Sequence, residues 1–415
     1  MTSRERVLAS INHKQPDKIP VDLGSNPSSG ISAIAYDNLK KHLGMNHPTR
    51  VYDVVQQLAQ PDQEMIDHFG LDILDVGREF NTNDSDWYNY TLANGGTARY
   101  PVWYKPQKSD DGSWFTTDEE GVMLSKMPVG ATFFDQTYFP YLEGFPDDYK
   151  QLPDAMSKVM WVRDAHSPWD HAGDKDFWEQ LRAKALYLKE NTDKALFLSA
   201  GSNLFEFGTM LRRMDNFFMD LLMSPDEVAK LVDALMTMHL ATLEKVCDAV
   251  GDVVDIIRFG DDLGMTTGPF MDIETYRLLF KPHHKRLCSY VKEHSNMKIM
   301  LHSCGSIYQY IPDLIECGYD ILNPVQTNCL DMEPQKLKDE FGKDITFWGG
   351  GVDTAKVLNS FTPAEIRKHV LNRCEIFSKN GGFVFNTVHN IMPDVPPENI
   401  IAMFDAVKEF NGGSV

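Results

Sequence analysis

Short apolar runs alternate with longer amphipathic segments along the C-terminal two-thirds of the chain. The runs are rich in β-branched and aromatic residues and are bounded by turn-forming residues, which is typical of buried strands. The longer segments carry apolar residues at helical spacing, and several begin with Pro and acidic residues, as helix N-termini do. Six strands are therefore predicted at 195–201, 253–260, 298–302, 320–324, 345–349 and 382–386, with helices at 224–250, 272–294, 306–317, 333–341, 362–379 and 396–410.

Strand–helix repetition of this kind predicts parallel strands joined by right-handed crossovers. Two further apolar runs, at 19–23 and 71–76, bring the units to eight, the number that closes a barrel. The alternative is a doubly wound open sheet. No Gly-x-Gly-x-x-Gly and no Gly-Lys-Ser/Thr follows a predicted strand, which argues against a nucleotide-binding version of that sheet. We therefore predict an α/β fold, a single (β/α)8 TIM barrel in which residues 1–415 form one domain.

Residues 81–165 break the repeating pattern, because they are rich in aromatic and turn-forming residues. We predict that they form an insertion with β-hairpins between the second and third barrel strands. Two interpretations stay open for this insertion. It is either a lid or docking surface over the catalytic face, or a decoration packed on the side of the barrel.

Charge and cysteine usage narrow the class of protein. The chain has 40 Lys and Arg against 60 Asp and Glu, a net charge of -20, which argues against binding nucleic acid. Its basic stretch, 281–286, fits one helix face, with His283 and His284 on the surface. The first residues are charged where a signal peptide is apolar, and no run is long enough to span a membrane. The 6 cysteines lack disulfide-framework spacing, so we expect a cytoplasmic enzyme with thiols available to a metal.

The sequence His302-Ser303-Cys304-Gly305 follows the strand at 298–302. Alternate residues of a strand face the same side, so His302 and Cys304 are expected to point together into the barrel mouth. An imidazole and a thiolate at that position are ligand types that zinc prefers. A buried thiol beside a hydrogen-bonded core histidine would give the same pattern, and the spacing alone leaves both possibilities open.

Four more side chains follow predicted strands and are candidates for the same mouth. His389 follows the last strand and is a third candidate ligand, although a structural histidine is the alternative. Asp261 and Asp262 follow the strand at 253–260, and Glu206 follows the strand at 195–201. These carboxylates are predicted as catalytic acids or bases. They would equally suit capping of the next turn or a helix N-terminus.

The chain resembles the uroporphyrinogen decarboxylase superfamily, in its corrinoid-dependent methyltransferase branch. The resemblance implies a (β/α)8 barrel with Zn2+ at its mouth, held by His302 and Cys304. A later Cys of that branch falls on His389 here, a departure that implies a site of two nitrogen ligands and one sulfur ligand. The residues that carry the resemblance are Ser3-Arg-Glu-Arg-Val-Leu and the sequence on to Val21-Asp22, His302-Ser-Cys-Gly, Ile321-Leu-Asn-Pro-Val-Gln, Phe347-Trp-Gly-Gly, and Val388-His-Asn-Ile-Met-Pro-Asp-Val-Pro-Pro-Glu-Asn-Ile.

The function that this resemblance implies is methyl transfer. The enzyme would move a methyl group between a small methylated substrate, a methyl ether or methylamine in preference, and the cobalt of a corrinoid carried by a partner protein. A methylcobalamin:thiol methyltransferase and a non-catalytic corrinoid-docking protein are alternatives. A uroporphyrinogen-type decarboxylase is a third, but residues 24–30 replace the arginine-rich signature that would grip a polyanionic porphyrinogen.

Overall fold

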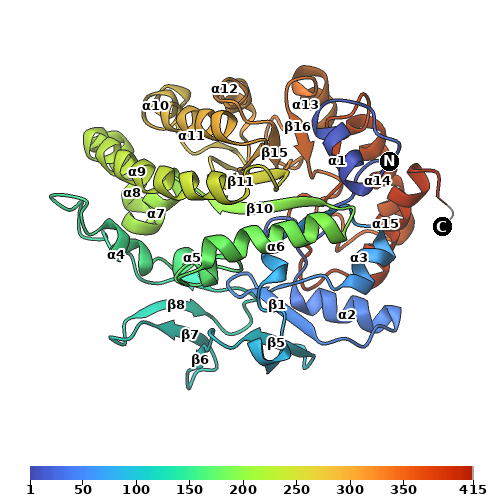
Figure 1. Cartoon of the computed structure of the whole chain (residues 1–415), viewed down its shortest axis with the longest axis horizontal. Coiled ribbons are helices and arrows are strands. Elements are labelled where there is room, and N and C mark those ends of the chain that lie inside the picture. The colour runs from blue at the N-terminus through green and yellow to red at the C-terminus, as the bar shows by residue number, and fades with distance from the viewer. Residues whose placement is uncertain (414–415) are drawn as a thin grey trace.

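The computed structural model describes residues 1–413. Its centre is a seven-stranded parallel sheet with the order β17-β16-β15-β14-β11-β10-β3 (Figure 1). All seven strands were predicted from the sequence. The observed strands at 195–201 and 298–302 have the predicted bounds, and the other five are shorter than predicted. They are β3 (Ile73–Asp75), β10 (Ala195–Gly201), β11 (Ile256–Gly260), β14 (Lys298–His302), β15 (Ile321–Asn323), β16 (Thr346–Trp348) and β17 (Phe383–Val384).

The segment predicted as a strand at 19–23 closes the sheet into a barrel. Val21 forms a parallel bridge with Phe385, and Asp22 N donates to Phe385 O at 2.9 Å. On the other side, Asp72 N donates to Val21 O at 2.9 Å, next to β3. The segment thus fills the gap between β17 and β3 with one bridge instead of a full strand. The predicted α/β fold with a closed barrel is confirmed.

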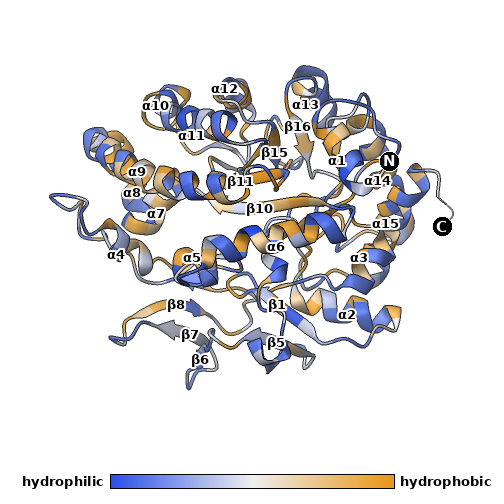
Figure 2. Ribbon diagram, in the orientation of Figure 1, coloured by the Kyte–Doolittle hydropathy of each residue, from blue (hydrophilic) through white to orange (hydrophobic). Residues whose placement is uncertain are grey.

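Helices form the outer layer, with their apolar faces on the strands, and Figure 2 shows the hydrophobic colouring of β10 and β11 beside hydrophilic outer helix faces. The single helix predicted at 272–294 is divided in two. Pro282 lies in the first turn of the second helix and has no N–H to donate to the preceding helical turn. The helices are α1 (Ser3–Ile11), α2 (Ala33–Leu43), α3 (Gln63–Phe69), α4 (Leu152–Ser157), α5 (Met160–Arg163), α6 (Phe177–Asn191), α7 (Phe205–Arg212), α8 (Met214–Met223), α9 (Pro225–Val250), α10 (Ile273–Leu279), α11 (Lys281–His294), α12 (Ile311–Cys317), α13 (Pro334–Phe341), α14 (Pro363–Phe377) and α15 (Pro397–Phe410). Within residues 1–413, none of them has the length and hydropathy needed to cross a membrane.

The barrel interior is apolar at one end and polar at the other. Because side chains alternate along a strand, the inward positions that follow Ile256, Met300 and Ile321 are occupied by Arg258, His302 and Asn323. These polar groups lie at the C-terminal ends of the strands, where TIM barrels carry their active sites. The apolar end is covered by α1 and consists of Val7, Ile11, Ile73, Ala195, Phe197, Ile256, Met300, Ile321, Trp348 and Val384.

The β structure outside the barrel forms two four-stranded sheets, with the orders β2-β1-β5-β4 and β6-β7-β8-β9. Residues 81–165 supply all of these strands except β1 and β2. Those two lie before the second barrel strand and were not predicted. The strands are β1 (Thr49–Asp53), β2 (Leu58–Ala59), β4 (Trp87–Thr91), β5 (Thr97–Pro101), β6 (Gln107–Lys108), β7 (Trp114–Thr117), β8 (Met123–Met127) and β9 (Asp135–Gln136), and a separate hairpin joins β12 (Gly264–Met265) to β13 (Gly268–Pro269).

Candidate metal centre

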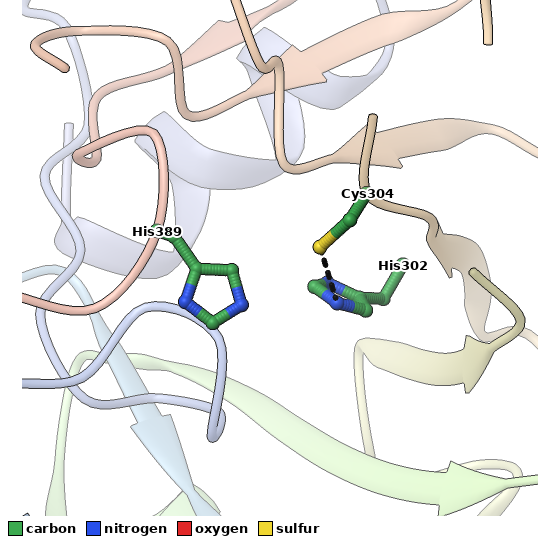
Figure 3. A group of neighbouring side chains, drawn as sticks. All are labelled: His302, Cys304 and His389. Atoms are coloured by element: carbon green, nitrogen blue, oxygen red, sulfur yellow. Dashed lines mark hydrogen bonds between the residues drawn. The ribbon is translucent and has the colours of Figure 1, made fainter. Parts of the chain in front are cut away.

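Three side chains from distant parts of the chain meet at the mouth of the barrel. His302 ends β14, Cys304 lies two residues later, and His389 lies in the loop after β17 (Figure 3). Each offers one ligand atom, and these atoms all lie within 4.8 Å of one another. The Cys304 Sγ atom is 3.5 Å from His302 Nε2. Two imidazole nitrogens and one sulfur at this spacing suit a single zinc ion, with one coordination position left for a substrate atom or water.

The neighbouring strand fixes the orientation of the His302 ring. Asn323 Nδ2 donates to the carbonyl oxygen of Trp348 at 3.0 Å, so its Oδ1 faces His302 Nδ1, at 2.9 Å. The Nδ1 atom must therefore carry the proton, and Nε2 presents a lone pair toward Cys304. Burial lowers the pKa of His302 well below its ordinary value, and the charges of Arg258 and His389 lower it further. This ring is held in the neutral tautomer that a metal ligand needs.

Cys304 lies near two carboxyl groups, those of Asp262 and Glu206. Its backbone N–H donates to Asp262 Oδ1 at 2.8 Å. Burial raises the pKa of Cys304 well above its usual range, and the charges of Asp262 and Glu206 add to that effect. A bound cation favours the thiolate, so metal binding at this position releases a proton.

His389 depends on contacts between the two ends of the chain. Its neighbour Asn390 donates to the carbonyl oxygen of Pro27 at 2.8 Å and accepts from Gly30 N at 2.7 Å. Burial lowers the pKa of His389 to about 4, with Arg258 as a second cause. The loop at 386–391 and the loop at 24–30 are thereby joined beside the candidate ligands. Closure of the barrel is what brings His389 to β14.

A cavity of about 540 Å³ is lined by two of the three candidate ligands, His302 and His389. This volume suits an organic ligand with a ring more than a one-carbon compound. The end of the 81–165 segment contributes Trp161 and Asp164 to its wall. Other lining residues are His302, His389, Arg258, Glu206, Asp262, His239, Trp169, Phe207, Met156, Met210 and Met238.

Glu206 and Asp262 both line this cavity. Asp262 Oδ1 lies 3.5 Å from His302 Nε2, within reach of the metal ligands. Glu206 is partly buried, and desolvation raises its pKa well above the usual range, with Asp262 and Asp261 as further causes. Burial also raises the pKa of Asp262. The raised pKa values favour the protonated forms of these two carboxyl groups, which makes them candidates for transferring a proton to a reacting atom.

Asp261 lies behind the cavity and has no place in its wall. Its side chain is 0% exposed and accepts from Phe205 N at 3.1 Å and Glu206 N at 2.9 Å, the first N–H groups of α7. It also lies 3.0 Å from His284 Nε2. Asp261 thus positions α7 and Glu206, whereas the other two carboxyl groups predicted from the sequence, Glu206 and Asp262, line the cavity.

The placement of His284 on the surface was wrong. Its side chain is buried, and its two ring nitrogens contact Asp261 and the hydroxyl of Tyr276. The signal was present in the sequence, because Leu287, Cys288 and Val291 lie three, four and seven residues after it and form the buried face of α11. His283, on the next face, is half-buried near Asp233, with 3.6 Å between His283 Nε2 and a carboxylate oxygen.

Three functional neighbours were missed in the sequence. Asn323 was noted within a strand and within the motif Ile321-Leu-Asn-Pro-Val-Gln but was given no role, yet it orients His302. Arg258 is a charge within an otherwise apolar strand, which is the signal that could have identified it. Ser28 accepts from Arg258 Nη2 at 2.8 Å and lies 3.5 Å from His302 Nε2. No local pattern distinguishes this serine from its neighbours in the loop at 24–30.

Comparison with known families agrees with this architecture. The family model described as uroporphyrinogen decarboxylase (URO-D) matches residues 188–410, more than half of the chain. The chain belongs to the URO-D family. The part matched by the URO-D model extends from α6 to the end of α15 and contains His302, Cys304 and His389.

Curated URO-D relatives match part of the chain. The uroporphyrinogen decarboxylase of Pseudoalteromonas translucida is 46% identical over 186 residues, which are 42% of this chain and 49% of the relative. That of Methylococcus capsulatus is 27% identical over 175 residues, which are 41% of this chain and 48% of the relative. The chain thus spans about half the length of these relatives in the alignments.

A solved structure extends the likeness to the whole chain. A methyltransferase from Methanosarcina mazei covers 99% of this chain and 99% of its own, with a TM-score of 0.58 and 16% sequence identity. At this level of identity the likeness establishes a common fold. It includes the N-terminal segment that lies before the URO-D match.

Proposed function

We propose that this URO-D family protein is a zinc-dependent methyltransferase. It moves the methyl group of a small methyl ether to the cobalt of a corrinoid, which a separate partner protein carries. The observation that carries the proposal is the convergence of His302, Cys304 and His389 at the barrel mouth, where the two histidines line a cavity. The fold shared with a methyltransferase over 99% of both chains supports it.

Zinc held by these three residues would supply Lewis-acid chemistry, which makes an ether oxygen a better leaving group. The protein's own contribution is orientation and proton supply. Asn323 keeps His302 Nε2 directed at the ligand position, and Cys304 is anchored to Asp262 through its backbone. Glu206 and Asp262 line the same cavity, and desolvation raises the pKa of both carboxyl groups, which favours their protonated forms.

The reaction balances as a transfer of a methyl cation equivalent. The bond between carbon and oxygen breaks with its electron pair on oxygen, and that oxygen takes a proton from Glu206 or Asp262. The electron pair for the new carbon–cobalt bond comes from the cobalt(I) co-substrate, whose cobalt is formally oxidised to cobalt(III). Since two of the three ligands are neutral imidazoles, the site carries less negative charge than a thiolate-rich one, which favours activating the methyl donor over activating a thiol acceptor.

Decarboxylation of a porphyrinogen is the second reaction to test, because the curated relatives carry that name. A porphyrinogen substrate has many carboxylates, and arginine is the residue that binds them best. Among the cavity-lining residues in the part of the chain that the structure describes, Arg258 is the only arginine. We expect no carbon dioxide release from uroporphyrinogen III.

The test measures metal content and methyl transfer in one preparation. Purified protein is expected to contain about one zinc per chain, and His302→Ala and Cys304→Ser are expected to lose it. Cys329→Ser is the matched control, since Cys329 lies outside the group of candidate ligands and its Sγ donates to Asn328 Oδ1 at 3.7 Å. Formation of methylcobalamin from cobalt(I) cobalamin and a panel of methyl ethers reports the reaction. Wild-type protein that binds zinc but transfers no methyl group from any donor would contradict the proposed function.

A further inference from the structure

Three buried side chains form a hydrogen-bonded row behind the wall of the cavity. Asp261 Oδ2 lies 3.0 Å from His284 Nε2, and His284 Nδ1 lies 3.1 Å from the hydroxyl oxygen of Tyr276. Their exposed fractions are 0%, 1% and 0%, and none of the three lines the cavity. They therefore do not touch a molecule bound in that cavity, and any part they play in a reaction there passes through a neighbouring residue.

Asp261 joins three elements of the barrel. Its backbone N–H donates to the carbonyl oxygen of His302 at 2.9 Å, which attaches it to β14. Its carboxylate accepts from Phe205 N at 3.1 Å and from Glu206 N at 2.9 Å, at the start of α7. His284, on α11, is the only basic side chain of residues 1–413 within 4.0 Å of that carboxylate. Asp261 thus fixes the start of α7 relative to β14 and α11.

This arrangement supplies a cap that α7 lacks locally. The first N–H groups of a helix have no partner within the helix, and a Ser, Thr, Asp or Asn at the N-cap ordinarily accepts from them. The N-cap residue of α7 is Leu204, whose side chain has no acceptor. Asp261 replaces that cap from the end of β11. The first turn of α7, which carries Glu206, therefore depends on Asp261 for its position.

His284 holds the Asp261 carboxylate in its capping orientation. Backbone N–H groups on both oxygens favour the ionised form of Asp261, so His284 Nε2 donates to it and the Tyr276 hydroxyl donates to His284 Nδ1. A buried carboxylate is costly unless its oxygens are hydrogen-bonded. His284 also lies on the buried face of α11, where an apolar residue is ordinarily found. The imidazole is therefore placed there for its donor.

We propose that His284 is a positioning residue for Glu206 and acts on it through Asp261. The inference rests on the proposed function, in which Glu206 is one of two groups that protonate the leaving oxygen. The carboxyl end of Glu206 is held by Asn203 Nδ2, and Asn203 O accepts from His239 Nε2 at 2.8 Å. With its backbone anchored by Asp261 and its carboxyl group by Asn203, Glu206 keeps one orientation toward the cavity, as proton transfer to a bound atom requires.

The experiment compares kcat and KM of wild type, His284→Leu and His284→Gln with dimethyl ether, 2-methoxyethanol and methoxybenzene as methyl donors. His284→Leu removes the donor to Asp261, whereas His284→Gln keeps an N–H at a similar distance. We expect the leucine variant to lose at least about 10-fold in kcat with an unchanged KM, because a small misplacement of a catalytic group is enough for such a loss. The glutamine variant should recover most of it. His283→Leu, on the next face of α11, is the control and should keep the wild-type kcat. Equal kcat in wild type and His284→Leu, or no recovery in His284→Gln, would overturn the inference.

A double-mutant cycle tells the positioning of Glu206 apart from a general loss of stability. Glu206→Gln should be slow but measurable, because Asp262 remains as a second proton donor. In that background His284→Leu should cause no further loss of kcat, since the group that it positions is already gone. Losses that multiply would overturn the inference. If His284→Leu fails to fold, Tyr276→Phe takes its place, with a smaller loss of kcat that disappears in the same background. A wild-type kcat in Tyr276→Phe, or a loss that persists beside Glu206→Gln, would then overturn it.

Hydrogen exchange separates failure of this inference from failure of the proposed function, because it needs no reaction. The amides at 205 and 206 should exchange about 10-fold faster in His284→Leu than in wild type, with the segments outside α7 and α11 unchanged. If exchange changes in this way and wild type forms no methylcobalamin, the methyltransferase proposal fails and the positioning role stands. If His284→Leu forms methylcobalamin at the wild-type rate, the methyltransferase proposal stands and the positioning role is wrong.

Discussion

The amide oxygen of Asn323 lies 2.9 Å from Nδ1 of His302, and the other half of the same amide is held by the carbonyl oxygen of Trp348. This pair of contacts, which joins β15 to β14 on one side and to β16 on the other, decides which nitrogen of His302 is free to bind a metal. The candidate metal site therefore depends on strand register as well as on its three candidate ligands.

Asn323→Ala removes the group that orients His302. Loss of a hydrogen-bonding partner behind a histidine ligand typically weakens metal binding by about 10-fold to 100-fold, and we expect a loss of zinc affinity in that range. Competition with a calibrated chelator measures it. Asn328→Ala makes the same chemical change in the following loop and should leave the affinity unchanged. Equal affinities in wild type and Asn323→Ala would show that the His302 ring needs no support.

His389→Ala removes a proposed ligand, whereas His389→Cys replaces it with another. We expect the alanine variant to lose zinc affinity by more than about 100-fold, beyond the effect of losing an orienting group. The cysteine variant should keep about one zinc per chain but demethylate ethers more slowly, since a second thiolate lowers the Lewis acidity of the ion. Zinc analysis after dialysis and methylcobalamin formation measure the two effects. Full zinc retention by His389→Ala would remove His389 from the site.

Gly305 sets the path of the chain after Cys304. It has φ of 87°, and an added Cβ would lie 2.2 Å from the backbone of Gly264. Gly305→Ala should therefore displace the Cys304 loop and reduce zinc affinity. Gly44→Ala is the matched control, since Gly44 has φ of 74° with nothing within 4 Å of an added Cβ. It should cost about 1 kcal/mol in unfolding free energy from backbone strain alone and keep the metal. Identical zinc affinities in the two variants would contradict this account of the loop.

Protonation of His239 makes the free energy of unfolding depend on pH. Burial lowers its pKa from 6.5 to about 4, with Nε2 donating to Asn203 O at 2.8 Å. His239 binds a proton near pH 6.5 in the unfolded chain but only near pH 4 in the folded protein. Its contribution to the free energy of unfolding is therefore complete above pH 6.5 and is lost as the pH falls toward 4. Between about pH 7 and pH 4.5 the loss is about 2 kcal/mol.

His239→Gln keeps a donor for Asn203 O but cannot be protonated, so its unfolding free energy should fall less steeply over this range than that of wild type. Urea unfolding at the two pH values measures the difference. The exposed His68 provides the control, because His68→Gln should leave the pH dependence of wild type unchanged. A His239→Gln protein with the wild-type pH dependence would show that this proton is not excluded by folding.

The sequence was informative where local pattern determines structure. Apolar strands such as the one ending at His302 were found within a few residues, because buried parallel strands are nearly continuous apolar runs. The strand at 19–23 was placed correctly in the ring but forms only one bridge, at Val21. Residues 205–223 were not predicted as helices, although α7 and α8 lie there next to the site.

The parts that could not be predicted depend on contacts made by barrel closure. The partner of His302 is Asn323, and the partner of Arg258 is Ser28, and neither pair is close in sequence. Asp261 and Asp262 are adjacent in sequence, yet they face opposite sides, one toward His284 and one toward the cavity. Strand alternation predicts that adjacent side chains point to opposite sides, but it does not predict which of the two points into the barrel mouth.

The most direct test of the metal centre is zinc X-ray absorption spectroscopy on the purified wild-type protein. The account predicts bound zinc with one sulfur at about 2.3 Å and at least two nitrogens at about 2.0–2.1 Å. Protein without zinc after expression in zinc-containing medium, or zinc whose nearest atoms include no sulfur, would contradict a site made of His302, Cys304 and His389.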